Sequence, residues 1–87
     1  MQAVVVRISI NEEEAATEAL REEVVPRVSQ APGFVAGYWT RKDNTGLSMI
    51  VFESDEAAKA ASEQIPSTVP DSVTLEGVEV REVVANA

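Results

Sequence analysis

The residues best suited to binding a ligand are concentrated in one part of the chain. All four aromatic residues lie between positions 34 and 52, namely Phe34, Tyr38, Trp39 and Phe52. Trp39 and Tyr38 are candidate ligand-binding residues, because either ring could stack on a flat apolar molecule. Arg41 and Arg7 are candidates as well, because a guanidinium could lie near a polar substituent of that molecule. The alternatives are that the rings only pack in a core or an interface, and that the arginines pair with the abundant glutamates.

Several reaction classes are excluded by side chains that the chain lacks. It contains no cysteine and no histidine. Thiolate nucleophiles, His-based triads, zinc sites and haem held by a histidine are therefore not expected. The sequence also has no phosphate-binding glycine loop, nucleophile elbow or calcium loop. We identify no catalytic residue, no metal site and no cofactor from the sequence, and whether the protein is an enzyme stays open.

Length and charge limit the range of partners. The chain has 87 residues, 15 of them acidic and 7 basic, and a net charge of −8. A chain of this length is expected to form a single domain over residues 1–87. The phosphates of a nucleic acid would be repelled, so no nucleic-acid partner is expected. No stretch approaches the ~20 apolar residues of a membrane span, and the N-terminus lacks a signal-peptide cleavage site, so we expect no membrane partner and a cytoplasmic location.

Alternation of side chains predicts four strands. In residues 3–10, one face carries only apolar side chains, those of Val4, Val6, Ile8 and Ile10. Similar runs predict strands at residues 34–42, 46–53 and 73–84, the last with a bulge or bend at Gly77. The turn residues DNTG separate the second and third runs, with the glycine expected in a left-handed conformation. These two strands should form an antiparallel hairpin.

The first helical segment is expected to start at Asn11. Asn11 is a favourable N-cap, and apolar residues recur every four positions in the segment that follows, at Ala16, Leu20, Val24 and Val28. Pro26 lacks an N–H and should kink this helix or end it near Val25, with another turn following.

The second helix completes the predicted order. It is expected at residues 54–65, with Ser54 as its cap and Pro66 directly after its end. The elements then run β-α-β-β-α-β, which is typical of the ferredoxin-like fold of the α+β class. In that fold a four-stranded antiparallel sheet carries two helices on one face.

The predicted strands are apolar on both faces. With strict alternation, Phe34 and Tyr38 lie on one side of the hairpin, and Val35 and Trp39 on the other. Two helices can cover only one face of the sheet, and a half-exposed antiparallel sheet would be polar on its open face. We therefore expect a homodimer formed through the sheet faces. An exposed ligand platform is the alternative, although it leaves a large apolar patch in water.

Two stretches carry a resemblance to a known family. The segment APGFVAGYW, which leads into the second strand, and the segment VFESDEAAKAA, which runs from the third strand into the second helix, resemble the dimeric α/β-barrel superfamily. The antibiotic-biosynthesis-monooxygenase-like and stress-responsive barrel groups are the most similar. The resemblance implies two sheets packed into a barrel in the dimer and a pocket between sheet and helices. It transfers no catalytic residue, because this chain lacks the histidine of the haem-degrading branch and has Phe52 in the region where the group often has a tryptophan.

A second resemblance has the same order of elements. GLSMIVFESDEAAKAA is also similar to the third strand and second helix of an RNA-recognition motif. That module stacks bases on aromatic residues of its first and third strands and has basic residues nearby. The first predicted strand has no aromatic residue and the net charge is −8, which argues against it.

The function expected from the sequence is accordingly broad. The protein is predicted to be a small dimeric α/β-barrel protein that is either non-catalytic or binds an apolar or aromatic small molecule. The alternative is a cofactor-independent, monooxygenase-like enzyme acting on an aromatic metabolite, which would rely on desolvation and positioning because no strong base is apparent.

Overall fold

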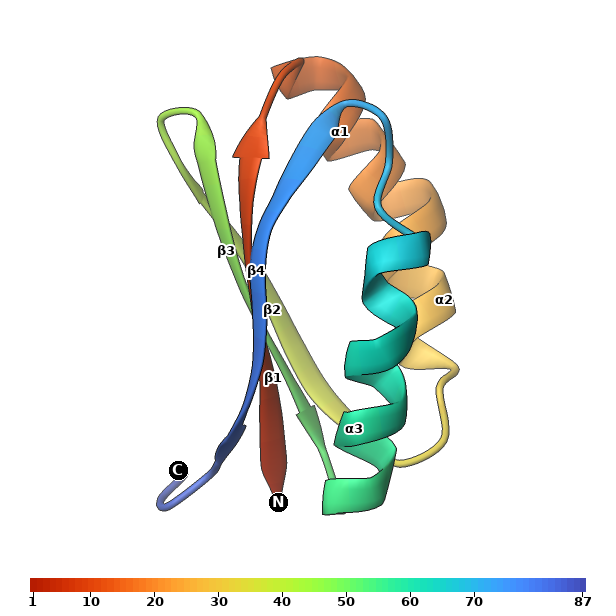
Figure 1. Ribbon diagram of the computed structural model, residues 1–87, viewed down its shortest axis with the longest axis vertical. Helices are drawn as coiled ribbons and strands as arrows, with labels where there is room; N and C mark the ends of the chain where they lie inside the picture. Colours follow the sequence, from red (N-terminus) through yellow and green to blue (C-terminus); the bar gives the residue numbers. More distant parts are fainter.

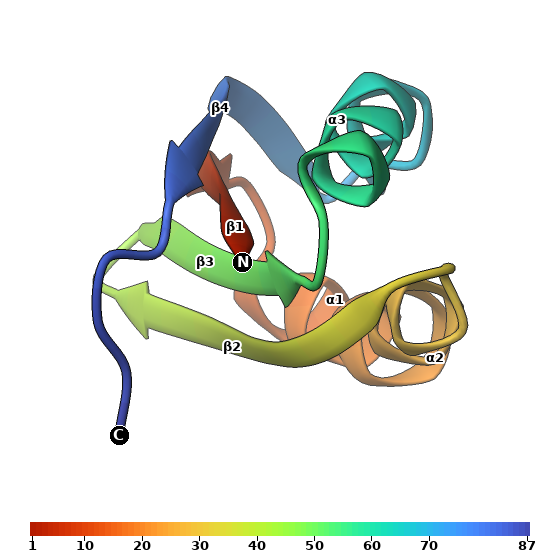
Figure 2. The same ribbon diagram turned by 90° about the horizontal axis from the view of Figure 1, so that it is seen from below.

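A computed structural model of residues 1–87 shows a four-stranded antiparallel sheet whose helices all pack on one face (Figure 1). The strands are β1 (Gln2–Ile10), β2 (Phe34–Lys42), β3 (Thr45–Phe52) and β4 (Val73–Glu82). The helical segments are α1 (Glu13–Ala19), the π-helical η1 (Leu20–Val24), α2 (Val25–Ser29), α3 (Asp55–Gln64) and the 3-10 turn η2 (Ile65–Ser67). The strand order is β2-β3-β1-β4 (Figure 2), which confirms the predicted ferredoxin-like fold.

The best-packed part of the core lies between the central strands and α3. Val4 and Val6 of β1, Ile50 and Phe52 of β3, and Ala58 of α3 form one buried cluster. The Phe52 ring is 1% exposed. It meets the ring of Phe34 edge-on, with 6.3 Å between the ring centroids and 81° between the planes, a favourable aromatic arrangement.

The two helix starts differ from each other. As predicted, Ser54 caps α3, because its hydroxyl accepts a hydrogen bond from the backbone N–H of Ala57 at 3.2 Å. The predicted cap at Asn11 is wrong. The N-cap is Glu12, whose side chain makes no capping bond. The Asn11 amide instead donates to the hydroxyl of Thr74 on β4 at 3.2 Å, so Asn11 ties the end of β1 to a neighbouring strand.

Pro26 changes the hydrogen bonding of the first helical segment. Before the proline the chain forms the π-helix η1, in which the N–H of Val25 donates to the carbonyl of Leu20. Pro26 then lies in the first turn of α2, where a missing N–H is tolerated. The helical path continues for one further turn to Ser29, as expected from the sequence.

The hairpin between β2 and β3 is confirmed, but its turn has two residues, and not the four of DNTG. The turn residues are Asp43 and Asn44, and Asp43 is the residue with a left-handed φ of 55°. Gly46 was expected in that conformation, and this expectation is wrong. Gly46 pairs with Ile8 and Arg41 inside the sheet, where it has a different role, described below.

A β-bulge in β2 overturns the predicted division of the aromatic rings. Phe34 pairs with Phe52, but the next pair is Ala36 with Val51, so Val35 is an extra residue. Beyond the bulge the alternation is shifted by one position. Phe34 and Trp39 therefore share the face under the helices, and Tyr38 lies on the outer face. The bulge expected in β4 is present next to Gly77.

The outer face of the sheet is apolar across β2 and β3. Tyr38 is 68% exposed, and Leu47 and Met49 are each about half exposed. The sequence predicted that no other part of the chain covers this face. The structure confirms this, because all the helices lie on the opposite face of the sheet (Figures 1 and 2). No helix is both long enough and apolar enough to cross a membrane.

Replacing Phe52 tests the core. Phe52→Ala should lower the free energy of unfolding by about 3–5 kcal/mol, because it removes a fully buried ring and leaves a cavity. Val84→Ala, at a position that is 89% exposed, should change it by less than about 0.5 kcal/mol. Urea unfolding at one fixed protein concentration measures both. Equal stability of the two variants would contradict this description of the core.

Candidate ligand-binding pocket

A cavity of about 370 Å³ lies between the sheet and the first helical segment, which consists of α1, η1 and α2. β1, β2, β3 and β4 form its floor, α1, η1 and α2 form its roof, and the loop after α3 closes one side. Twelve of its twenty lining residues are apolar: Val6, Ile8, Ile10, Ala16, Leu20, Val24, Val28, Trp39, Ile50, Ile65, Val69 and Val73. The four-residue apolar stripe predicted for the first helical segment therefore faces this cavity.

Small residues on β3 leave the space that forms the cavity. Phe52 and Ile50 fill the inner face of β3 near α3, but the next two inner positions are Ser48 and Gly46. A Cβ atom at Gly46 would lie 2.7 Å from Cγ1 of Ile8, so the neighbouring strand already occupies the space beside this glycine. Gly46 therefore makes room for Ile8, and Ser48 is the small side chain of β3 that leaves the floor of the cavity open.

Trp39 forms the aromatic wall of the cavity. Its indole lies back along β2 over Gly37, since a Cβ atom at Gly37 would be 2.7 Å from Cη2 and 2.8 Å from Cζ3 of the ring. Glycine at position 37 is what allows the ring to lie against its own strand. The ring is partly buried and presents its apolar surface to the cavity.

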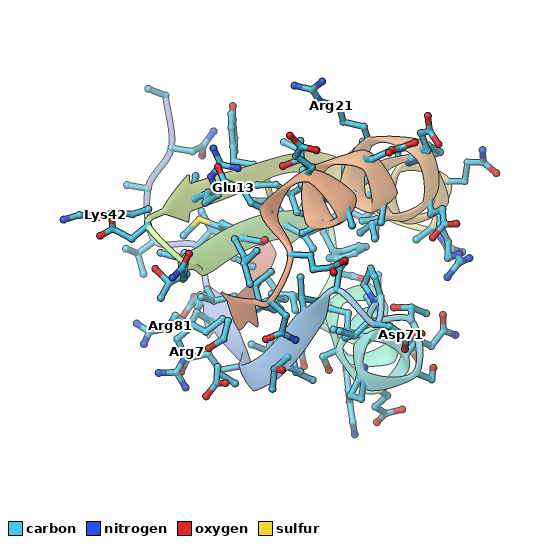
Figure 3. All side chains as sticks on the ribbon, turned by 90° about the horizontal axis from the view of Figure 1, so that it is seen from above. Arg7, Glu13, Arg21, Lys42, Asp71 and Arg81 are labelled. Carbon is cyan, nitrogen blue, oxygen red and sulfur yellow. The ribbon has the colours of Figure 1, made fainter.

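The rim of the cavity is polar. Nη1 of Arg41 lies 2.9 Å from Oε1 of Glu13 and 3.4 Å from the hydroxyl of Thr17, so Arg41 links β2 to α1. A second hollow of about 380 Å³ adjoins the first at Thr17, Arg21 and Arg41. It has no apolar residue and is lined by Glu13, Glu14, Thr17, Glu18, Arg21, Glu22 and Arg41. In Figure 3, Glu13 lies on α1 and Arg21 extends away from the sheet.

One polar residue in the lining of the cavity, Ser48, is buried and was not among the residues predicted from the sequence. Ser48 is 7% exposed and lies on the inner face of β3, paired with Val6 on one side and Trp39 on the other. Its parity with Ile50 and Phe52 was the available signal, since residues two apart on a strand share a face. A serine in the middle of a strand does not by itself indicate a binding residue.

The structure divides the four candidate residues between the two faces. Trp39 and Arg41 line the cavity, whereas Tyr38 and Arg7 lie on the opposite face of the sheet. Arg7 lies across Gly77 on β4, and Figure 3 shows it on the side of the sheet away from the helices. Because successive residues of a strand point in opposite directions, only one of Trp39 and Tyr38 reaches the cavity, and that residue is Trp39. A ligand contact by any of the four stays a prediction.

The lining determines which chemistry the cavity can support. Its ionisable side chains are those of Arg21 and Arg41, and both are exposed at the rim. No carboxylate lines it, and the side chains of its floor and roof offer no general base. The cavity can exclude water from an apolar molecule and hold that molecule in one orientation.

Comparisons with known proteins give the fold. No model of a protein family matches the sequence, and no curated protein matches it at a significant level. Among solved structures, a variant of SnoaB, a cofactor-independent oxygenase from Streptomyces nogalater, matches with a TM-score of 0.73 at 18% identity, over 98% of this chain and 94% of that one. A dimeric ferredoxin-like protein from an uncultured marine organism matches with a TM-score of 0.68 at 13% identity, over 100% and 98% of the two chains.

A third solved structure belongs to MhuD, a heme degrader from Mycobacterium tuberculosis. A variant of MhuD with two manganese protoporphyrin IX molecules per active site matches with a TM-score of 0.63 at 18% identity, over 100% of this chain and 98% of that one. These solved proteins and this chain share the ferredoxin-like fold. At these identities the likeness establishes the fold alone. Any ligand has to be argued from the residues of the cavity.

Gly37→Ala tests the position of the indole. The added Cβ cannot occupy its place while the Trp39 ring stays where it is, so the ring must move. Because Trp39 is the only tryptophan, its fluorescence emission and near-UV circular dichroism should change. Gly77→Ala is the matched control, since its Cβ would meet only the guanidinium of Arg7 on the outer face. Unchanged spectra in Gly37→Ala would show that the ring does not lie over Gly37.

Proposed function

We propose that the protein binds an apolar small molecule, of the size of a fused aromatic ring system, in the cavity between sheet and helices. The observation that carries this proposal is the cavity itself, about 370 Å³ with twelve apolar lining residues. Small-molecule sites are of this kind, since they range over roughly 300–1,000 Å³ and are mainly apolar with a few polar groups. Water in such a cavity finds few hydrogen-bonding partners, so its release by an apolar ligand is favourable.

Trp39 is the proposed principal contact. It is the only aromatic residue that lines the cavity, and its ring offers a broad flat surface held in place by β2. Stacking of a ligand ring on an indole adds to the gain from burial of apolar area. Arg41 is proposed to close the rim over the ligand through its contacts with Glu13 and Thr17, and not to bind the buried part of the ligand.

Cofactor-independent oxygenation is the second candidate function. The likeness to SnoaB favours it, although that likeness concerns the fold. The cavity would contribute desolvation and positioning, and without a cofactor the reducing electrons would have to come from the substrate. An oxygen electrode would record oxygen uptake upon addition of an aromatic substrate if this activity exists, and Trp39→Ala should slow it.

Haem is not proposed as the ligand. MhuD holds a metalloporphyrin in its active site, but the usual axial ligands of a haem iron are histidine, cysteine, methionine or tyrosine side chains. None of these side chains lines the cavity described here. The donor set therefore does not suit haem iron, and no haem chemistry is derived for this chain.

The outer face supports a homodimer and argues against RNA. β1 and β3 carry no aromatic residue on this face, where an RNA-recognition motif needs them.

We propose that a second copy of the chain covers the outer face, with Tyr38, Leu47 and Met49 in the interface. Charge favours this arrangement. Ten of the fifteen acidic residues lie within residues 11–30 and 53–65, on the helical side, whereas the outer face carries the paired Arg81 and Glu79, Arg7, and Glu76, which accepts a hydrogen bond from Ser9.

Adjacent residues of β2 allow a direct test of the pocket. Trp39→Ala should weaken binding of the neutral fluorescent probe N-phenyl-1-naphthylamine by about tenfold or more, because it removes the stacking wall. Tyr38→Ala should leave the affinity nearly unchanged, since Tyr38 points to the other face. Fluorescence titration gives both dissociation constants. Equal weakening by the two substitutions would show that the probe does not bind between sheet and helices.

Oligomeric state tests the proposed dimer. Size-exclusion chromatography with light scattering at low micromolar concentration should give a mass of twice 9.3 kDa. Met49→Glu should give a monomer, because it would bury an unpaired charge in the interface. Ala60→Glu adds the same charge on the exposed side of α3 and should remain dimeric. A wild-type monomer would contradict the proposed cover of the outer face.

A further inference from the structure

The buried hydroxyl of Ser48 is the feature that the proposed function leaves unexplained. Ser48 is 7% exposed and lines the cavity from the middle of β3. Its cross-strand partners on the sheet are Val6 and Trp39, and the next inner residue of β3 toward α3 is Ile50. Among the residues on the floor of the cavity, it contributes the only buried polar side chain.

A hydroxyl in such a place needs a partner. A hydroxyl taken out of water is destabilising unless it makes a hydrogen bond. The side-chain hydrogen bonds within the chain involve other residues, and none of them uses the Ser48 hydroxyl. Its backbone is already used in the ladders to β1 and β2. Its hydroxyl is therefore free to bond a molecule in the cavity, either water or an oxygen atom of a ligand.

The rim is a poor place for recognition of a ligand's polar group. Arg41 is already engaged by Glu13 and Thr17. Four glutamates and two arginines line the hollow outside the rim, so its charge is negative overall. An anionic group would be repelled there, and would lose its hydration without gaining a cation if it were carried to the floor.

We infer that Ser48 determines the specificity of the pocket, which takes a neutral, largely apolar ligand with one hydroxyl or carbonyl oxygen at its buried end. This inference rests on the proposed function and adds the direction in which the ligand lies. The apolar body contacts Trp39 and the roof, and the oxygen meets Ser48 at the floor. A serine hydroxyl both donates and accepts, so either kind of oxygen can bind.

Three two-ring probes of similar shape test the inference. They are 2-naphthol, 2-methylnaphthalene, in which a methyl replaces the hydroxyl, and 2-naphthoate, which carries a charge. Displacement of N-phenyl-1-naphthylamine at pH 7 gives their affinities. The wild type should bind 2-naphthol about fivefold to tenfold more tightly than 2-methylnaphthalene, as expected for one neutral hydrogen bond. 2-Naphthoate should bind most weakly.

Two substitutions locate the recognition. Ser48→Ala should remove the preference for 2-naphthol while the affinity for 2-methylnaphthalene is retained. Ser9→Ala removes a strand hydroxyl that lies outside the cavity and bonds Glu76, and should keep the preference. Ser48→Ala should also be about as stable as the wild type in urea, because the Ser48 hydroxyl makes no hydrogen bond within the chain. Ser48→Cys, with a similar volume and a weak S–H donor, should show a reduced preference.

The outcomes separate this inference from the proposed function. Equal affinity of the wild type for 2-naphthol and 2-methylnaphthalene overturns the role of Ser48 but leaves an apolar pocket. The same holds if the preference survives in Ser48→Ala. Tightest binding of 2-naphthoate overturns the inference in favour of recognition at Arg41. Failure of every probe and of N-phenyl-1-naphthylamine to bind overturns the proposed function, and this inference with it.

Discussion

The sheet has two faces and helices for only one of them, and most of the structure depends on this constraint. The side chains of β2 and β3 point either to the helices or to the outer surface, because successive residues of a strand point in opposite directions. Trp39 and Tyr38 are neighbours in the chain and lie on opposite faces. The extra residue Val35 shifts the alternation of β2 by one position, and so determines which of the residues after it face the helices. Without the bulge, Phe34 could not share a face with Trp39.

The cavity follows from the sizes of the residues on that inner face. Near α3 the layer between sheet and helices is filled by Phe52, which packs against Phe34 and Ala58. Under α1 and η1 the positions of β3 are Ser48 and Gly46, and the roof consists of medium-sized aliphatic residues. The interior is therefore dense at one end and hollow at the other. The dense end can supply stability to a small chain, while the hollow end is free to bind a ligand.

The sequence was sufficient for the order of the elements, the cap at Ser54, the effect of Pro26 and the bulge near Gly77, because each depends on local chemistry. It was insufficient where two faces had similar patterns. Both faces of the strands are apolar, so hydrophobic alternation could not show which face meets the helices. A bulge also shifts alternation without an obvious residue signal, as at Val35. The turn glycine was misplaced for a related reason, since Asp43 can also adopt a left-handed conformation.

The same two strands serve both proposed roles of the protein, and this has a thermodynamic consequence. Trp39 and Ser48 line the cavity, while their chain neighbours Tyr38 and Met49 form the surface proposed to meet a second copy. A shift of β2 or β3 that accommodates a ligand also moves the outer surface. If such a shift makes the dimer bind ligand more tightly than the monomer does, linkage requires the ligand to tighten dimerisation by the same factor per site. Ligand binding and dimerisation therefore depend on the same two strands, β2 and β3.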